Sequence, residues 1–246
     1  IPSVGCSQGA AQAIARGLKG VVYLPNILGC GQMAEDRGIV KRTLAGFGAN
    51  PNVFSVLVVG NGCEENAAPE LQKEIARTGK WVEALVIQEE GGTRKTVFKG
   101  RHIVKEMLSR GARAAREPIP LKELIVGTEC GGSDFTSGIA SNPAVGIASD
   151  MLVAEGATVI LSETPELIGA EHLVAQRART AEIGKKILVA VAWWENRVLA
   201  SGQNIRKSNP APGNIAGGIT TLEEKSLGCI YKGGTGCIEE FLPYAS

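Results

Sequence analysis

The sequence predicts an α/β fold built on a mostly parallel sheet with helices on both faces. Short apolar runs alternate along the chain with longer helical patterns, which is the order of β-α units. The apolar runs are rich in Val, Ile and Leu without strict alternation, as expected of strands that are covered on both faces. Glycine makes up 32 of the 246 residues and aromatic residues only 4%, so we expect an aliphatic core and many tight turns.

The predicted strands and helices follow one another in this order. The expected strands are Gly20–Leu24, Val53–Val59, Trp81–Gln88, Leu124–Thr128 and Thr158–Ser162. The expected helices are Ser7–Leu18, Glu35–Phe47, Pro69–Thr78, Thr93–Ser109, Pro143–Glu155, Glu166–Thr180, Ala181–Leu199 and Leu222–Leu227. Pro69 and Pro143 suit a first helical turn, and Asn66 and Asn142 stand where side-chain caps are expected.

Two segments without a regular pattern divide the chain. Ala112–Leu121 contains two prolines and is interpreted as a linker, so that residues 1–115 and 116–246 are the expected halves. Gln203–Gly218 is rich in glycine and proline and is expected to be a long ordered loop or a lid in the C-terminal half. The chain opens without Met on Ile1–Val4, which resembles the tail of a strand, and we expect it to be a piece of a longer polypeptide.

Composition excludes several classes of protein. Lys and Arg number 26 and Asp and Glu 25, and this net charge of +1 argues against a general nucleic-acid binder. A hydrophobic content of 44% is too high for a disordered chain. No apolar run of about 18 residues and no signal peptide is found, so we expect no membrane partner and a cytoplasmic location.

Four of the six cysteines stand beside glycine at predicted strand ends: Cys6, Cys30, Cys63 and Cys130. No CxxC pair or zinc-finger spacing is present, so reduced thiols are expected rather than disulfides. Acidic residues follow predicted strands as well, namely Glu64, Glu129, Asp134 and Glu163. Because ligands of such sheets bind outside the carboxyl ends of the strands, we expect these groups to line one rim.

Other motifs are weak or missing. Gly60–Glu65 follows a strand and precedes a helix, as a dinucleotide loop does, but the third glycine is missing, and nucleotide binding stays an alternative to a plain tight turn. No Walker loop, GxSxG elbow or HExxH pair occurs. Of the two histidines, His172 stands near a helix start and is a catalytic candidate, whereas His102 is expected to be an ordinary helix residue.

Two runs of glycines and small polar residues carry the predicted binding site. Gly127–Ser141 gathers compact hydrogen-bonding groups around paired glycines, whose N–H groups can approach an anion. A cradle for a carboxylate or an oxyanion is therefore favoured over a plain turn. Asn209–Gly218, followed by Lys225 and Lys232–Thr235, is typical of a binding loop.

These two runs carry a resemblance to a known family. ECGGSD (129–134), SNPAVG (141–146), SETPELIGAEHL (162–173), NPAPGN (209–214) and KGGT (232–235) resemble the central domain of the altronate/galactarate dehydratase family, which also includes the large subunit of sulfolactate sulfo-lyase. Weaker matches, from IPSVGCS at residue 1 to IQEEGGT at residue 87, follow the family's order. The resemblance covers essentially the whole chain. It implies a small N-terminal domain or subunit and a C-terminal domain beyond residues 1–246.

The resemblance implies a lyase that eliminates water from a hydroxylated sugar acid and yields a 2-keto-3-deoxy acid. A proton leaves the carbon beside the carboxylate and a β-hydroxyl departs, and a divalent ion, Fe²⁺ or Mn²⁺, is implied to stabilise the enolate. The catalytic candidates are Lys225, Glu163, His172 and Asp134. The substrate-binding candidates are Gly131, Gly132, Ser133, Ser137, Asn142, Asn209 and Asn214. The metal candidates are Cys30, Cys63, Glu129 and Cys130. Glu166 is carried over without an assigned role, and a homo-oligomer is expected.

Two alternatives stay open. A sulfolactate sulfo-lyase large subunit would eliminate sulfite instead of water, and a ligand-binding scaffold would be inert. Many members of the family carry a His shortly before the GCG turn, whereas this chain has Pro25–Leu28 there. That departure bears on the substrate and on any metal ligand at this position.

Overall fold

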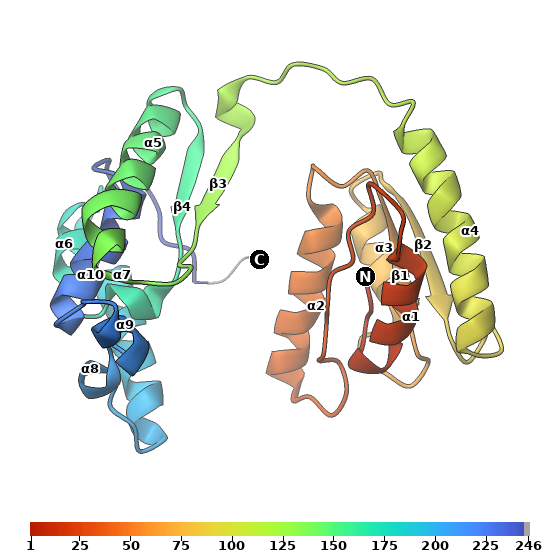
Figure 1. The fold of residues 1–246 in the computed structure, drawn as a ribbon, viewed down its shortest axis with the longest axis horizontal. Coiled ribbons are helices and arrows are strands. Elements are labelled where there is room, and N and C mark those ends of the chain that lie inside the picture. The colour runs from red at the N-terminus through yellow and green to blue at the C-terminus, as the bar shows by residue number, and fades with distance from the viewer. Residues whose placement is uncertain (244–246) are drawn as a thin grey trace. The chain divides into compact units, whose positions relative to one another are not determined.

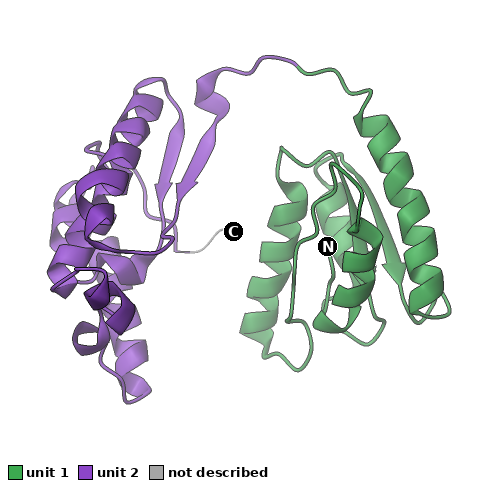
Figure 2. Ribbon diagram, viewed as in Figure 1, with its two compact units in different colours: residues 1–116, 245–246 green, residues 117–244 purple. Residues whose placement is uncertain are grey.

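The computed structural model describes residues 1–243, which form two compact units that meet in sequence at Arg116 and Glu117 (Figures 1 and 2). Unit 1 contains α1 (Gln8–Ala15), α2 (Ala34–Ala49), β1 (Ser55–Gly60), α3 (Ala68–Ala76), β2 (Trp81–Val86) and α4 (Thr93–Gly111). Unit 2 contains β3 (Ile125–Thr128), α5 (Asn142–Ala154), β4 (Thr158–Leu161), α6 (Glu171–Gln176), α7 (Ala181–Ala200), α8 (Ile205–Ser208), α9 (Pro212–Ala216) and α10 (Leu222–Ile230). The α/β class and the parallel pairing of strands are confirmed. Within the described residues, no helix is both long and apolar enough to cross a membrane.

In unit 1 a parallel sheet lies between two layers of helices. β1 and β2 pair from Ser55↔Trp81 to Gly60↔Val86. The N-terminal segment lies along β1 as well, because the Val59 N–H donates to the Ile1 carbonyl at 2.8 Å. Alternate strand residues point to opposite sides, as the pleat requires. One set packs against α2 and α3 and the other against α1 and α4, so both faces of this sheet are covered.

Unit 2 holds a second, smaller sheet. β3 and β4 pair in parallel from Ile125↔Thr158 to Thr128↔Leu161. This register places Ile125 and Ile160 on one face, where 66% and 40% of their surfaces are exposed. The apolar core of the unit lies instead among its helices and turns. Its buried members are Leu167, Ile168, Ala170, Val174, Ile187, Val191, Leu222 and Ile230.

Three sequence predictions differ from the structure. The strand predicted at Gly20–Leu24 is wrong, because this segment forms no strand and its Val21 and Tyr23 side chains pack on the cluster between α1 and α4. The helix predicted over Glu166–Thr180 is interrupted at Gly169, whose φ of +109° suits glycine. The segment Gln203–Gly218, expected as a loop, carries the short helices α8 and α9.

The two predicted caps are also wrong. α3 follows Ala67 and α5 follows Ser141, and neither of these residues makes a side-chain cap. The Asn66 amide donates instead to the carbonyl of Arg37 at 3.1 Å. Asn142 lies within the first turn of α5 and donates to the carbonyl of Gly228 at 2.9 Å. Both amides therefore tie separate elements together.

The turn before α5 and the turn after α10 position the site. Ser137–Ser141 forms a π-helical turn, a rare conformation that is frequent at functional sites. The 3₁₀ turn Tyr231–Gly233 packs directly against α5. A Cβ at Gly146 would lie 2.1 Å from the Tyr231 carbonyl oxygen, so a residue larger than glycine has no room there. Residues 231–233 are thus held close to the axis of α5.

Candidate functional site

The carboxyl ends of β3 and β4 bring Cys130 and Glu163 together. Because the two strands are parallel neighbours, the residues that follow them lie at the same edge of the sheet. The Cys130 N–H donates to Glu163 Oε2 at 2.7 Å. Glu163 has a φ of +66°, and among the described residues it is the only non-glycine residue in the left-handed region. Such a conformation costs free energy and is often maintained at functional sites.

The buried ammonium group of Lys232 completes this arrangement. The side chain is 2% exposed, and its Nζ lies 2.8 Å from Glu163 Oε2 and 2.8 Å from Cys130 Sγ. Burial by itself would raise the pKa of Glu163, but the Lys232 ammonium, together with hydrogen bonds from Cys130 and Glu129, outweighs burial and lowers this pKa to about 2. Glu163 is therefore ionised at neutral pH. A carboxylate with so low a pKa is a weak proton acceptor.

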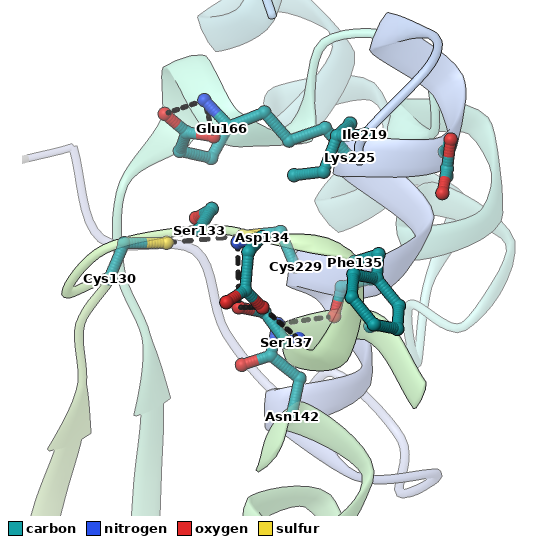
Figure 3. A pocket seen from close by; sticks show the side chains of 13 residues that line it. Cys130, Ser133, Asp134, Phe135, Ser137, Asn142, Glu166, Ile219, Lys225 and Cys229 are labelled. Atoms are coloured by element: carbon teal, nitrogen blue, oxygen red, sulfur yellow. Dashed lines mark hydrogen bonds and ion pairs between the residues drawn. The ribbon is translucent and has the colours of Figure 1, made fainter. Parts of the chain in front are cut away.

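A second group of side chains adjoins Cys130 (Figure 3). The sulfur atoms of Cys130 and Cys229 are 3.9 Å apart. Together with a carboxylate oxygen of Glu166, they form a set of donor atoms that all lie within 4.8 Å of one another. Burial raises the pKa of the Cys229 thiol to about 12. Glu166 Oε2 is buried and lies 3.1 Å from Lys225 Nζ.

Lys225 links Glu166 to the C-terminal binding loop. Its Nζ lies 3.1 Å from Glu166 Oε2 in an ion pair and donates a hydrogen bond to Asn209 Oδ1 at 2.9 Å. Lys225 stands on the first turns of α10, which begins where the Thr221 hydroxyl accepts the N–H of Glu224 at 3.1 Å. The side chain is 12% exposed. Its ammonium is therefore positioned from two sides, by Glu166 and Asn209.

The glycine-rich run and α10 line one pocket, which Figure 3 shows, and the binding loop is hydrogen-bonded to the glycine-rich run beside it. The Phe135 N–H donates to the Gly217 carbonyl at 3.0 Å, and the Asn214 amide donates to the Ser133 carbonyl at 3.0 Å. The polar and sulfur-bearing residues that line the pocket include Cys130, Ser133, Asp134, Ser137, Asn142, Glu166, Lys225 and Cys229.

Several predicted residues lie in or beside this pocket with their polar groups already engaged. The Asp134 carboxylate accepts from the Thr136 hydroxyl at 2.5 Å and from the Ser137 N–H at 3.2 Å, so it closes its own turn. These hydrogen bonds, the one from the Thr136 hydroxyl first, lower the pKa of Asp134. Gly131 and Gly132 are exposed, with open space around both.

The remaining predicted residues lie elsewhere. His172 is exposed in the first turn of α6 and does not line the pocket. Glu129 is exposed and accepts a hydrogen bond from the Ser162 hydroxyl at 3.2 Å. Cys30 and Cys63 are exposed in unit 1, where the described residues bring no three metal-ligating side chains together. Within unit 2 the structure thus groups Cys130 with Cys229 and Glu166, and Glu129 is not part of this set.

The Gly60–Glu65 turn is closed by its own side chain. Glu64 Oε2 accepts the N–H groups of Gly62 at 2.7 Å and Asn61 at 3.1 Å, and the Ser3 hydroxyl donates to Glu64 Oε1 at 2.7 Å. Burial would raise the pKa of Glu64, and these hydrogen bonds lower it overall. The N–H groups that a nucleotide phosphate would need are therefore occupied, which favours a tight turn over a dinucleotide loop.

Sequence reasoning missed Cys229 and Lys232 as site residues. Cys229 lies within a helix, where a buried cysteine is ordinarily part of the core. Lys232 opens the KGGT segment, which the sequence alone assigns to a binding loop without separating its lysine from its glycines. The available signal was a lysine followed by two glycines, a composition that lets the backbone approach other elements closely.

Comparison with known proteins places these observations in a family. Residues 121–246 match the family described as D-galactarate/altronate dehydratase, C-terminal, and residues 1–112 match the D-galactarate dehydratase/altronate hydrolase second domain.

The chain is 35% identical to an altronate dehydratase of Bacillus subtilis (strain 168), over 99% of this chain and 50% of that protein. It is 37% identical to a (2R)-sulfolactate sulfo-lyase subunit beta of Chromohalobacter salexigens, over 96% of this chain and 60% of that protein. It is 39% identical to a galactarate dehydratase (L-threo-forming) of Escherichia coli (strain K12), over 82% of this chain and 40% of that protein. The chain thus spans about half the length of the curated relatives it matches. It belongs to the D-galactarate/altronate dehydratase family.

Proposed function

We propose that this chain carries the reaction centre of a lyase that removes water from a hydroxylated sugar acid. The observation that carries the proposal is the convergence of Cys130, Cys229, Glu166 and Lys225 in one pocket of unit 2. Relatives named altronate dehydratase and galactarate dehydratase support the reaction class. The product expected from such an elimination is a 2-keto-3-deoxy acid.

The reaction breaks a C–H bond beside the substrate carboxylate and a C–O bond at the neighbouring carbon. A base takes the proton of the C–H bond, whose electron pair forms the new double bond. The hydroxyl takes a proton from an acid and leaves as water, and the enol then tautomerises to the keto acid. We propose Lys225 as the acid, because its Nζ is fixed by Glu166 and Asn209 and reaches the pocket. Glu163, with a pKa of about 2, is assigned to positioning rather than to proton transfer.

The donor set in this pocket fits a divalent cation. Two thiols and one carboxylate, from Cys130, Cys229 and Glu166, converge within 4.8 Å. We propose that Cys130, Cys229 and Glu166 hold the metal. Sulfur donors suit Fe²⁺ better than Mn²⁺, which prefers oxygen ligands. When bound, such an ion would supply Lewis-acid stabilisation of the developing enolate.

The remaining polar groups of the pocket are proposed to bind the anionic substrate. Asn142, Ser133 and Ser137 line it, and Lys225 offers the positive charge that a carboxylate needs. A small N-terminal domain or subunit, a C-terminal domain and a second copy of the chain are proposed as partners. Elimination of sulfite is the second candidate reaction, favoured by the 37% identity to a subunit named as a sulfo-lyase.

The test uses the full-length protein with altronate, galactarate and sulfolactate, each with added Fe²⁺ or Mn²⁺. Release of a 2-keto-3-deoxy acid supports dehydration, and release of sulfite supports the second candidate. Lys225→Met is expected to lower kcat by about 10²- to 10⁴-fold, the range for a lost general acid. The control is Lys186→Met, at an exposed lysine paired with Glu182 on α7. No product from any of the three acids would overturn both reactions.

A further inference from the structure

We propose that Lys232 is a positioning residue that holds the Cys130 sulfur in place for metal binding. The inference rests on the proposed metal site of Cys130, Cys229 and Glu166, and it assigns a role to a residue outside that set. Lys232 does not line the pocket, so it acts through Cys130 rather than on the substrate.

The first argument is the burial of a charge. Lys232 is the largest of the fully buried side chains in the described structure, and only 2% of it is exposed. Removing an ammonium group from water is costly unless partners compensate for it. Its two partners here are Glu163 Oε2 and Cys130 Sγ, each at 2.8 Å. Replacing such an ion pair by apolar side chains is often neutral for stability, so folding alone does not require it.

The second argument is that the contacts form a closed ring. Glu163 Oε2 accepts the Cys130 N–H at 2.7 Å and also the Lys232 ammonium, while the same ammonium donates to Cys130 Sγ. Cys130 is therefore fixed at both its backbone and its sulfur. The ring also accounts for the left-handed backbone of Glu163, since that conformation persists only where surrounding contacts impose it.

The third argument is that the backbone carrying Lys232 is itself fixed. The Ser149 hydroxyl donates to the Lys232 carbonyl at 2.8 Å. Asp150 Oδ1 accepts the N–H of Thr235 at 2.8 Å, three residues further along. From another side, Arg177 Nη2 donates to the carbonyl of Gly236 at 2.9 Å. The ammonium is thus presented from a rigid turn, as positioning of a neighbouring ligand requires.

Cys130 Sγ is also the sulfur that lies 3.9 Å from Cys229 Sγ. A residue that orients it sets the geometry of the whole donor set. Outer residues of this kind typically change metal affinity by about 10- to 100-fold when they are replaced.

The experiment titrates the chain with Co²⁺ as the probe and follows the thiolate-to-cobalt charge-transfer absorption. Removing Lys232 alone would leave the Glu163 carboxylate without its cation, so the test variant is the double substitution K232M/E163Q. We expect it to fold, by circular dichroism, and to bind Co²⁺ about 10- to 100-fold more weakly than the wild type. K232R, which keeps the cation, is expected to bind more tightly than the double variant. K186M serves as the control and is expected to bind as the wild type does.

Equal affinity in K232M/E163Q and the wild type would overturn the role of Lys232 and leave the metal site standing. A wild-type chain without the absorption band would overturn the metal site and the role of Lys232 together. If the double variant does not fold, K232R decides the matter alone. Wild-type affinity in a folded K232R supports positioning by a cation at this place, and loss of the band in a folded K232R would overturn the inference. A K232R that also fails to fold would assign Lys232 to the fold and overturn the inference.

Discussion

The ion pair between Glu163 and Lys232 makes the stability of unit 2 depend on acid pH in a calculable way. In the folded chain the Glu163 pKa is about 2, against an ordinary value of 4.5. The unfolded chain therefore binds more protons between these two values. The stabilisation is fully present above pH 4.5 and is lost as the pH falls through the folded pKa. The substitution Glu163→Gln removes the titrating group and should remove this dependence.

The size of the effect follows from the shift. Each pKa unit corresponds to about 1.4 kcal/mol, and the side chain is 21% exposed, which screens part of the interaction. We expect Glu163→Gln to lower the free energy of unfolding by about 2 to 3 kcal/mol at neutral pH. Near pH 3 the wild type has lost about half of the contribution, so the difference should fall to about 1 kcal/mol.

The assay is urea unfolding of the metal-free chain at the two pH values. Both proteins carry Trp81→Phe, so that the fluorescence signal comes from Trp193 and Trp194 in unit 2. Other carboxylates titrate equally in both proteins, and only the difference between them reports Glu163. A difference that is the same at both pH values, or that grows on acidification, would refute the reasoning.

Three further predictions concern packing and hydrogen bonds. Gly146→Ala should lower the unfolding free energy of unit 2 by about 3 kcal/mol, the upper end of overpacking, because its Cβ would meet a backbone oxygen at 2.1 Å. Gly213→Ala, with open space around it, should be neutral in the same urea experiment, and equal losses would contradict the packing argument. Arg177→Met should destabilise the turn after Lys232 by about 1 to 2 kcal/mol, because the Arg177 guanidinium donates to the Gly233 and Gly236 carbonyls. Amide hydrogen exchange of residues 233–238 should then be roughly tenfold faster, and unchanged exchange would contradict this role. Lys80→Met should lower the unfolding free energy of unit 1 by about 1 to 2 kcal/mol, because the Lys80 ammonium donates to the last carbonyls of α2. Urea unfolding followed by Trp81 fluorescence, in a chain without the other two tryptophans, would measure this loss. An unchanged urea midpoint would exclude a capping role for Lys80.

Local patterns predicted most elements of the fold. Val53–Val59 and Trp81–Gln88 are predominantly apolar runs, and the structure has β1 and β2 there. The same kind of run led to a wrong prediction at Gly20–Leu24, where Val21 and Tyr23 are half-buried by packing on α1 and α4 without any strand partner. The division of the strands between two sheets depends on contacts far apart in sequence, which periodicity does not encode.

The site was predictable where its residues end strands and not where its residues come from helices. Cys130 and Glu163 could be paired because parallel strands end at one edge. Cys229 and Lys232 reach the same place through the packing of α10 and of the turn after it. The roles of Glu163 and Asp134 depend on which donors surround their carboxylates, and only the folded structure supplies those donors.

The left-handed backbone at Glu163 separates what favours the fold from what favours the chemistry. At a φ of +66° glycine is the residue with the least strain, so Glu163→Gly would relieve the backbone while deleting the carboxylate that anchors Lys232. Directed evolution for heat tolerance alone would be free to accept changes of the Glu163–Lys232 pair as a unit, glycine included. Screens for robust variants of this protein should therefore select on turnover in every round, since resistance to unfolding and a working pocket impose different requirements at this one residue.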